Sequence, residues 1–493
     1  MKLKAKWIDF SSGGPLVGVL HQHDAISLNI KPLDRIKLCF GNKQIVVTTD
    51  ITRDKKQVKP GEIGLFKDLK KHTKVKKGQQ ISVKYEKEPS SIDLIKKKLD
   101  GKELNKEEIN EIVKDIISNS LTEVETTYFV SACYMRKMTL NETKYLTEAI
   151  INNSGKLHFQ KHPIADKHCI GGIAGNRTTM IMIPILAAAG VTIPKTSTKS
   201  ITSPAGTSNT MEVLAPISFS NKEIVNIVNK TNACMVWGGQ GELASADDKL
   251  IKIERPLHLD ATGFLLSSIL AKKTAADASH VLIDIPIGPE AKIKNKAMAK
   301  DLREKFLKLG RMFKLKINVI LSDGTQPIGN GIGPALEARD VLLALKGEGP
   351  KDLQEKSFAM AALLMKMVGI SKAEKKVKQI ILSGLAHKKM MEIIKAQGGN
   401  PKITPEKIKL APHTSIIKAQ KSGRVRYLSN REITRIAKLC GAPTHLKAGI
   451  YIHKKVGESI NKEEPMITLH AEDKSRLQDA IKEAKNSIIF NIA

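Results

Sequence analysis

The stretch from Asp166 to Asn209 decides the fold of this chain and reads DKHCIGGIAGNRTTMIMIPILAAAGVTIPKTSTKSITSPAGTSN. Two loops rich in small and hydroxylated residues flank one apolar segment that has the composition of a buried helix. The first loop carries Lys167, His168 and several glycines, and it leads into Thr178. A glycine loop that runs into a helix start presents backbone N–H groups and the positive end of the helix dipole, which suits a phosphate. The first loop therefore predicts an anion site.

The second loop follows the apolar segment and supplies a dense set of hydroxyl donors with one cation. Its polar residues are Ser197, Thr198, Lys199, Ser200, Thr202, Ser203 and Thr207. The alternative interpretation is a pair of strand-to-helix turns, in which such hydroxyls cap helices and close turns. The glycine loop is not a Walker loop, because no Gly-Lys-Ser/Thr follows the required spacing, and its glycines do not match a dinucleotide fingerprint. Residue pattern alone leaves the anion site and the turn equally open.

Blocks along the whole chain resemble, in the same order, the thymidine/pyrimidine-nucleoside phosphorylase family, which also contains the AMP phosphorylases. Besides the opening stretch, they are WGGQGELASADDKLIKIERPLHLDATGFLLSSILAKK from Trp237, VLIDIPIGPEAKIKN from Val281, DGTQPIGNGIGPALEARDVLLALKGEGP from Asp323 and AGIYIHKKVGESINKEEPMITLHA from Ala448. The N-terminal extension before the helical region is similar to that of the long subgroup. This subgroup includes archaeal AMP phosphorylases and bacterial proteins provisionally named thymidine phosphorylases of type 2. The spellings DKHCIGG and DGTQPIG are closer to the bacterial set.

Composition bounds the class of protein. A chain of 493 residues with 41% hydrophobic content is too long for one core and predicts several domains. No apolar run is long enough to span a bilayer, and the first residues lack the apolar stretch of a signal peptide. The five cysteines are scattered without a CxxC pair, which favours reduced thiols over disulfides or a zinc site. We therefore expect a cytoplasmic enzyme with no membrane partner.

The net charge of +31 is the unusual bulk feature. It raises the possibility of a nucleic-acid partner, because a basic surface releases counterions from a phosphate backbone. The lysines are spread in short runs, however, and aromatic residues make up only 4% of the chain, too few for stacking platforms. Nucleic acid is therefore an unlikely partner, and solvated lysine-rich faces are the simpler interpretation. The positive field would also attract a phosphorylated small molecule.

The chain divides by pattern into five segments. Short strand-like runs such as VGVL, AISLNI (Ala25–Ile30), RIKLCF, QIVVTT and ISVKYE predict a small β domain, and helical spacing follows it. Apolar β-like runs then alternate with helices, which is typical of an α/β domain. The predicted segments are an N-terminal β domain (1–86), a helical lobe (87–155), an α/β catalytic domain (156–345), a helical connection (346–411) and a C-terminal α+β domain (412–493).

The resemblance implies an α/β fold of the nucleoside phosphorylase kind, with a helical lobe and a larger α/β lobe that face each other across a cleft. Phosphate would bind on the α/β side and the nucleoside would span both lobes, which close and exclude water. Family members form homodimers through the helical lobe, and the N-terminal domain of AMP phosphorylases assists larger assemblies. Phosphorolysis attacks C1′ with phosphate itself, so the resemblance implies no cofactor, no metal and no protein nucleophile.

For the phosphate co-substrate, the resemblance implies a site made by the residues Lys167, Cys169, Thr178, Ser197 and Thr207. Lys167 would contribute a point charge and the others hydroxyl or backbone donors. Cys169 stands where many relatives carry serine, and a thiol donates weakly. His168 would lie beside the sugar as a catalytic residue, although a loop histidine is often only a hydrogen-bonded fixture.

Asp260 is the candidate general acid, since the matching aspartate of AMP phosphorylases protonates the purine as the bond breaks. A raised pKa would suit this role, and a helix N-cap is the alternative. Ser268 and Lys272 lie four residues apart, so they share a helix face and match residues that hold the base edge in thymidine phosphorylases. The arginine that completes the pyrimidine site in those enzymes corresponds to Ile253, and Arg255 is offset by two positions.

The resemblance also implies a nucleotide site made by Gly172, the loop residues Thr198, Lys199, Ser200, Ile201, Thr202 and Ser203, together with Thr207 and Lys292. Lys292 matches a lysine that AMP phosphorylases use on the nucleotide. Lys199 replaces a usual arginine and so loses bidentate phosphate recognition. On balance the residues favour a nucleoside 5′-monophosphate, converted to a free base and ribose 1,5-bisphosphate.

Three other functions remain open. The first is a thymidine or pyrimidine nucleoside phosphorylase, which Arg255 at the base would support. The second is a phosphoribosyltransferase, whose Mg²⁺ would need carboxylates such as Asp247 and Asp248, although these more simply cap a turn. The third is a non-catalytic nucleotide-binding or RNA-binding protein, which predicts binding without turnover.

Overall fold

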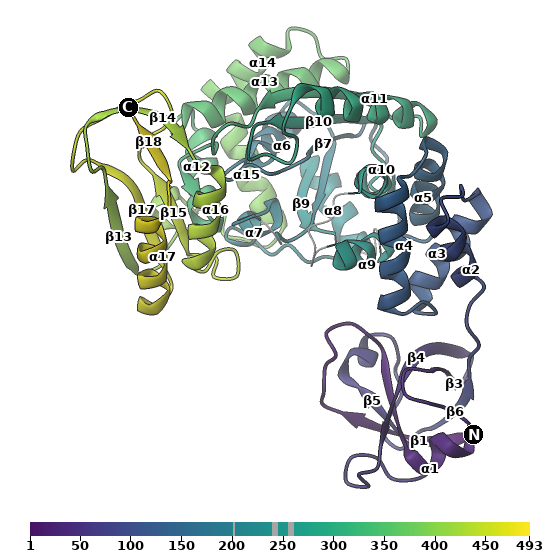
Figure 1. Ribbon diagram of the computed structural model, residues 1–493. Coiled ribbons are helices and arrows are strands. Elements are labelled where there is room, and N and C mark those ends of the chain that lie inside the picture. The colour runs from purple at the N-terminus through teal and green to yellow at the C-terminus, as the bar shows by residue number, and fades with distance from the viewer. Residues whose placement is uncertain (201–202, 239–244, 255–260) are drawn as a thin grey trace. The chain divides into compact units, whose positions relative to one another are not determined.

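The computed structural model describes residues 1–200, 203–238, 245–254 and 261–493 (Figure 1). The chain forms two compact units: residues 1–154 with 244–271, and residues 155–243 with 272–493. The first unit holds a barrel and a helical bundle, and the second holds an α/β core followed by a C-terminal domain. The fold class is the one that the sequence predicts.

The first unit begins with a closed barrel in the strand order β1-β5-β2-β4-β3-β6. Along β1, side chains alternate between exposed Lys2 and Lys4 and buried Leu3 and Ala5, as expected where one face of a strand covers a core. The strands are β1 (Lys2–Ile8), β2 (Val17–His21), β3 (Arg35–Phe40), β4 (Lys43–Thr52), β5 (Glu62–Phe66) and β6 (Gln80–Tyr85), with a 3-10 turn η1 (Lys67–Lys71).

One predicted strand of the barrel is wrong. Ala25–Ile30 was expected to be extended, but helix α1 (Gln22–Ser27) covers its first part. His21 caps this helix by accepting a hydrogen bond from His23 N on its ring nitrogen, and buried Asp24 lies in the first turn. Asp24 also accepts a hydrogen bond from Gly61 N (2.7 Å). Local capping therefore outweighs the strand-like apolar pattern.

The helices of the first unit have strong start signals. Asn105, Thr122 and Thr139 each form a capping box with the glutamate three residues later. The last of these glutamates, Glu142, also makes a buried ion pair with Lys98 (2.6 Å). The helices are α2 (Ser91–Leu99), α3 (Lys106–Ser118), α4 (Glu123–Arg136), α5 (Leu140–Asn152), α9 (Ser245–Glu254) and α10 (Thr262–Ala275), and the end of α10 from Lys272 onward belongs to the second unit.

Residues 244–271 fold with the first unit, whereas the predicted boundaries placed them in the α/β domain. Two contacts explain this difference. Lys249 donates to the carbonyl oxygens of Ile116 and Ile117 at 2.7 and 2.8 Å, and so satisfies the end of α3. Phe264 packs edge-on against Phe129, with ring centroids 5.8 Å apart. Such long-range contacts leave no local signal in the sequence.

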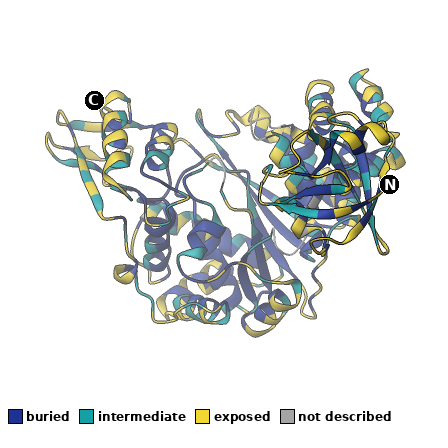
Figure 2. Cartoon of the chain, turned by 90° about the horizontal axis from the view of Figure 1, so that it is seen from below, coloured by how far each residue is buried: buried dark blue, intermediate teal, exposed yellow. Residues whose placement is uncertain are grey.

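The core of the second unit is a parallel sheet. Strands β7 (Ala165–Cys169), β10 (His280–Ile287) and β11 (Lys316–Asp323) pair in the order β11-β10-β7, and β8 (Ile193–Ser197) pairs with β9 (Ala233–Trp237). A hydrogen bond from Ala165 N to Thr192 O joins the two sheets at the start of β7. β10 is buried along nearly all of its length, which is typical of a parallel sheet covered on both faces. Figure 2 shows buried strands and helices, in dark blue, in the interior of the chain's α/β part.

Helices surround this sheet, and α6 (Thr178–Ala188) is almost entirely buried between α13 and α15. Its apolar residues contribute to one core cluster with those of α12 to α15. The helices of this unit are α6, α7 (Thr207–Glu212), α8 (Asn221–Thr231), α11 (Lys296–Met312), α12 (Pro334–Ala344), α13 (Lys351–Met367), α14 (Ala373–Leu382) and α15 (Leu385–Ala396), with a 3-10 turn η3 (Pro405–Lys407).

The C-terminal domain is built on two small antiparallel sheets. One has the order β12-β15-β17-β13 and the other β16-β14-β18, and α16 packs against α17. Its elements are β12 (Gly331–Ile332), β13 (His413–Lys418), β14 (Gly423–Leu428), α16 (Asn430–Leu439), β15 (Gly449–Ile452), β16 (Ser459–Ile460), β17 (Pro465–Ala471), α17 (Lys474–Asn486) and β18 (Phe490–Ile492). Across the described ranges, no helix combines the length and apolarity needed to cross a membrane.

Candidate active site

Two of the predicted phosphate residues are the last residues of parallel-paired strands: Cys169 ends β7 and Ser197 ends β8. Lys167 lies in the middle of β7, two residues before Cys169. β10 is hydrogen-bonded alongside β7 and runs in the same direction, so its residue Asp284 pairs with Cys169. The carboxyl ends of parallel strands form one edge of a sheet, and ligands of open α/β sheets bind at this edge. The sheet topology thus brings together residues that lie far apart in the sequence.

A chain of hydrogen bonds connects Lys167 to Cys169 through the start of α6. Lys167 Nζ donates to Thr178 Oγ1 (2.9 Å), and this hydroxyl donates to Asn176 Oδ1 (2.9 Å). The Asn176 amide in turn donates to Cys169 Sγ (3.4 Å). Arg177 is the N-cap residue of α6, and an arginine side chain has no acceptor for the first-turn N–H groups. The structure therefore sets a lysine, a hydroxyl and a helix N-terminus side by side.

Asp284 joins Lys167 to a second lysine that the sequence analysis missed. Its carboxylate lies 3.7 Å from Lys167 Nζ and 3.2 Å from Lys356 Nζ, and it accepts a hydrogen bond from Ser322 Oγ (2.5 Å). Burial works to raise the pKa of Asp284, but the two lysines together with hydrogen bonds from Ser322 and Cys169 outweigh burial, so the pKa is lowered. Asp284 is thus an anion that orients Lys167.

Asp166 forms the second buried carboxylate of the cluster. Its side chain meets Lys273 Nζ at 2.5 Å and Lys195 Nζ at 3.5 Å. Within the described part of the chain, this cluster joins four lysines (Lys167, Lys195, Lys273 and Lys356) to two aspartates (Asp166 and Asp284). Burial lowers the pKa of Lys167, and it lowers that of Lys195 to about 7. Desolvation is the main cause of both shifts and the neighbouring lysines add to it, so a bound anion would favour the charged lysines.

His168 lies beside this cationic cluster and is half-buried. Burial and the neighbouring Lys273, Lys195, Lys167 and Lys272 hold its pKa well below the ordinary value. The imidazole is therefore neutral near neutral pH, and it can offer one N–H donor and one acceptor rather than a charge. Cys169 is likewise uncharged, because burial and Asp284 raise the pKa of its thiol.

The glycine loop places Gly172 directly against Lys292. Gly172 has a φ of +92°, and a Cβ at this position would lie 2.7 Å from the backbone nitrogen of Lys292. The side chain of Lys292 is exposed. Asn430, which the sequence analysis missed, holds the loop from the C-terminal domain: its amide donates to Gly172 O (2.6 Å) and accepts from Ala174 N (2.8 Å). Gly172 and Lys292, both predicted to bind the nucleotide, are therefore neighbours.

The second loop is held mainly by its own hydroxyls. Ser197 Oγ shares a hydrogen bond with Ser208 Oγ, Ser200 Oγ with Ser203 Oγ, each at 2.6 Å. Asn209 accepts from Ser200 N and from Gly206 N, and so connects the loop to α7, which begins at Thr207. Thr198 is exposed. Ile201 and Thr202, both predicted to bind nucleotide, lie outside the described residues.

The side chain of Lys199 contacts two other residues of the protein, Glu212 and Trp237. Its Nζ donates to Glu212 Oε1 (2.8 Å) and lies 6.0 Å from the centroid of the Trp237 ring. The ion pair is substantially exposed, so it contributes little stability and can exchange partners with an incoming phosphate. A bound phosphate can therefore draw Lys199 away from Glu212.

Of the predicted base-binding residues, Ser268 and Lys272 are both half-buried on α10. Their spacing of four residues places them on one face of the helix. The candidate general acid Asp260 and the candidate base contact Arg255 lie outside the described residues. Asp247 and Asp248, considered for Mg²⁺, occupy the first turn of α9. A search of the described ranges finds no group of three or more His, Cys, Asp or Glu suited to hold a metal.

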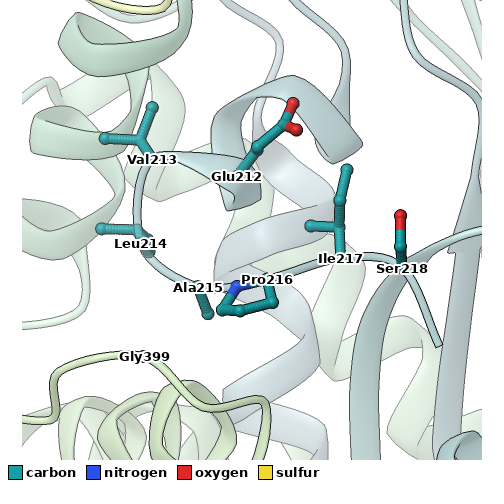
Figure 3. Close-up of a pocket in the computed structure, with 8 residues that line it drawn as sticks. All are labelled: Glu212, Val213, Leu214, Ala215, Pro216, Ile217, Ser218 and Gly399. Atoms are coloured by element: carbon teal, nitrogen blue, oxygen red, sulfur yellow. The ribbon is translucent and has the colours of Figure 1, made fainter.

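A pocket of about 480 Å³ is lined by none of the residues of the lysine cluster (Figure 3). It is formed by the turn after α7, which runs from Glu212 to Ser218, and by Gly399. Its lining is mostly apolar, and it contains none of the residues predicted to bind substrate. Its connection to the site is Glu212, the partner of Lys199.

We expect Cys169→Ser to strengthen phosphate binding. A hydroxyl donates a stronger hydrogen bond than a thiol, and the neighbours Lys167, Asn176 and Asp284 stay in place. The KM for phosphate should fall several-fold, by about 3–10-fold, in line with one improved hydrogen bond to a charged group, while kcat changes little. Steady-state kinetics at varied phosphate concentration measure both. A higher phosphate KM would show that the thiol packs in the site without contacting phosphate.

We expect Asn430→Ala to loosen the glycine loop from the C-terminal domain. The substitution removes the hydrogen bond to Gly172 O and leaves the buried Ala174 N without its partner, at a cost of about 1–3 kcal/mol for the buried group. A lower melting temperature and a higher nucleotide KM should appear together, measured by thermal unfolding and by kinetics. Asn461→Ala offers a control, because its side chain belongs to an exposed residue of the same domain. An unchanged nucleotide KM in Asn430→Ala would contradict the role of the loop.

Comparison with known proteins gives matches along most of the chain. The model described as "Glycosyl transferase family, helical bundle domain" matches residues 92–154. That described as "Glycosyl transferase family, a/b domain" matches residues 161–289. The C-terminal domain model of pyrimidine nucleoside phosphorylases matches residues 424–491. The three matches follow the order of the helical bundle, the α/β core and the C-terminal domain.

Curated relatives match over nearly the full length. The chain is 39% identical to the AMP phosphorylase of Thermofilum pendens over 97% of this chain and 92% of that protein. It is 41% identical to the AMP phosphorylase of Thermococcus kodakarensis, over 99% and 97%. A provisionally named thymidine phosphorylase of Legionella pneumophila is 39% identical over 92% and 89%. An anthranilate phosphoribosyltransferase structure from Thermus thermophilus aligns with a TM-score of 0.50 at 16% identity, covering 62% of this chain and all of that chain, which bears on the fold alone.

Proposed function

The chain belongs to the thymidine/pyrimidine-nucleoside phosphorylase family, and on that premise we propose that it is a pentosyltransferase acting on nucleoside 5′-monophosphates. Inorganic phosphate cleaves the N-glycosidic bond of an AMP-like substrate and yields a free base and ribose 1,5-bisphosphate. Identity of 39% and 41% to two AMP phosphorylases over nearly the full length supports the reaction class. The lysine cluster on β7 and β8 supports the chemistry.

The single observation that carries the proposal is the surplus of lysines over aspartates around Lys167. Two aspartates balance only part of the charge of four lysines, and the first turn of α6 adds N–H donors from Thr178 onward. A phosphate dianion supplies the missing negative charge and fills the donors, and it is then held where it can attack C1′. The protein's part is positioning and electrostatics, since the nucleophile carries its own charge.

The sugar and the base place different demands on the neighbouring residues. As the C1′–N bond breaks, positive charge develops on the ribosyl ring, and the attacking phosphate stabilises it. Neutral His168 can orient a ribose hydroxyl without adding a repelling charge. Ser268 and Lys272 on one face of α10 suit hydrogen bonds to the base edge. We assign the proton for the leaving base to Asp260 on the strength of its sequence match.

A monophosphate substrate is favoured by the neighbourhood of the glycine loop. Gly172 and Lys292 are adjacent, and exposed Lys292 can reach an anion that lies over the loop. Lys199 can exchange Glu212 for a phosphate oxygen. Ile253 stands where pyrimidine enzymes carry the arginine that holds the base. These features suit a 5′-phosphate better than a bare pyrimidine nucleoside.

The second candidate, a thymidine or uridine phosphorylase, is favoured by one observation. Lys199 is already paired with Glu212 and stacked near Trp237, which leaves less charge available for a 5′-phosphate. In that case the products are a base and a pentose 1-phosphate. The same phosphate site serves both reactions, so the two functions differ only in the contacts around the sugar 5′ position and the base.

A phosphate-dependent base-release assay tests the proposal. AMP, CMP, UMP, adenosine, uridine and thymidine are compared side by side, with and without a metal chelator, and products are separated by chromatography. Release from monophosphates alone supports the assigned substrate. Release from nucleosides alone supports the second candidate. Release that stops when the chelator is added indicates a Mg²⁺-dependent phosphoribosyltransferase. Absence of release from all six, with or without added Mg²⁺, overturns the proposal.

A further inference from the structure

We propose that Asp166 is a positioning residue that fixes the placement of three segments, each of which carries a predicted substrate contact. The segments are the end of β7, the end of β8 and the last turn of α10. Neither Asp166 nor Lys195 and Lys273, whose ammonium groups it meets, entered the site predicted from the sequence. The inference deepens the proposed function, on which it rests, by naming how one buried carboxylate aligns the phosphate contacts with a base contact.

The geometry around Asp166 is directional on both carboxylate oxygens. Oδ2 lies 2.5 Å from Lys273 Nζ, and Oδ1 lies 3.5 Å from Lys195 Nζ. Oδ1 also accepts a hydrogen bond from the backbone N–H of Lys167 (2.6 Å). Lys195 Nζ further donates to Lys167 O (3.1 Å), so both backbone groups of Lys167 are held within this network. All four residues are buried.

Each partner of Asp166 stands next to a predicted contact with substrate. Lys167 itself directly follows Asp166. Lys273 directly follows Lys272, which is assigned to the base edge, and Lys195 precedes Ser197 by two residues on β8, so both point to the same face of the strand. A shift of any one of these segments relative to the others is therefore resisted at Asp166.

Charge alone does not require this arrangement. A buried ion pair is often no more stabilising than apolar side chains of similar volume, because desolvation offsets the attraction. Its hydrogen bonds, in contrast, fix distances and angles between the segments, which apolar packing does less strictly. Misplacement of a reacting group by about 1 Å can lower a rate by about 100-fold. Asp166 therefore acts by aligning the segments. Its replacement should lower the catalytic rate even in a variant that still folds.

The test replaces the buried pair without changing the net charge. Asp166→Asn combined with Lys273→Met removes one negative and one positive charge, so the field at the phosphate site is conserved. The matched control is Glu142→Gln with Lys98→Met, which removes a pair of equal burial in the helical bundle, with side-chain exposures of 1% and 4% against 1% and 2%. Full-length variants are compared by thermal unfolding and by steady-state kinetics with AMP and phosphate.

We expect both double variants to remain folded with similar melting temperatures. The Asp166/Lys273 variant should lose about 100-fold in kcat/KM for AMP, whereas the control should stay within about 2-fold of the wild type. Asp166→Asn alone should unfold at a lower temperature than the double variant, because it leaves Lys273 without its counter-charge. The inference is overturned if the Asp166/Lys273 variant keeps the kinetics of the control.

The proposed function fails separately, and this is seen in the wild type. A wild type that releases no base from any nucleotide or nucleoside disproves the function. The role of Asp166 in alignment is then tested by the increase in melting temperature that inorganic phosphate causes. In that case the Asp166/Lys273 variant should lose most of the phosphate-induced shift and the control should keep it, whereas equal shifts in both overturn the inference.

Discussion

Replacing Lys167 with methionine is expected to lower kcat/KM for phosphate by about 10²–10³-fold, the usual loss when one preorganised donor to developing charge is removed. Lys167 is 1% exposed, its ammonium group touches Thr178 Oγ1, and Asp284 orients it at 3.7 Å. Methionine has a similar length and fills the same buried space, so the loss should come from the missing charge. Kinetics at varied phosphate concentration measure the effect.

Two further measurements separate loss of charge from loss of structure. Thermal unfolding with and without phosphate should show that Lys167→Met no longer gains stability from phosphate, although it folds. Lys300→Met removes one lysine from the exposed side of α11 and controls for the general positive field. If Lys167→Met retained wild-type phosphate kinetics, the cluster at the end of β7 would not be the phosphate site.

The proximity of Lys167, Cys169 and Thr178 could be predicted from the sequence, because the signal is local. A glycine loop, a lysine two residues into a strand and a threonine at the next helix start lie within a dozen positions, from Lys167 to Thr178. Parallel pairing of β7 with β10 and of β8 with β9 then brings the strand ends to one edge. Apolar runs predict strands such as β10, whereas the sequence places Lys167 and His168 in a loop and the structure places them on β7.

The supporting residues could not be predicted in the same way, because they depend on contacts between distant segments. Asn430 reaches Gly172 across 258 positions, and Lys273 reaches Asp166 across 107. In the sequence, Lys195, Lys273 and Lys356 look like any of the chain's many lysines, most of which are expected on the surface. Only the fold shows that Lys195 and Lys273 are buried, and that all three lysines lie beside aspartates. For the same reason, the sequence does not reveal that residues 244–271 fold with the first unit.

Asp260→Asn is expected to lower kcat for AMP by about 10²–10⁴-fold, the range in which a positioned general acid contributes to a rate. The residue lies outside the described ranges, so the expectation rests on its match to the aspartate that protonates the base in AMP phosphorylases. Inorganic phosphate should still stabilise the variant against thermal unfolding, since its binding depends on the Lys167 cluster. A nucleotide analogue whose leaving group departs without a proton should recover most of the lost rate.

Asp260→Ser distinguishes the acid from the competing role of a helix cap. Serine caps a helix about as well as aspartate, but it cannot deliver a proton near neutral pH. If Asp260 were a cap, the serine variant would keep nearly full activity and the asparagine variant would do the same, because asparagine also caps well. If Asp260 is the acid, both variants are slow on AMP and both are rescued by the activated analogue. Rescue therefore reports the proton itself, independently of any change in the fold around residue 260.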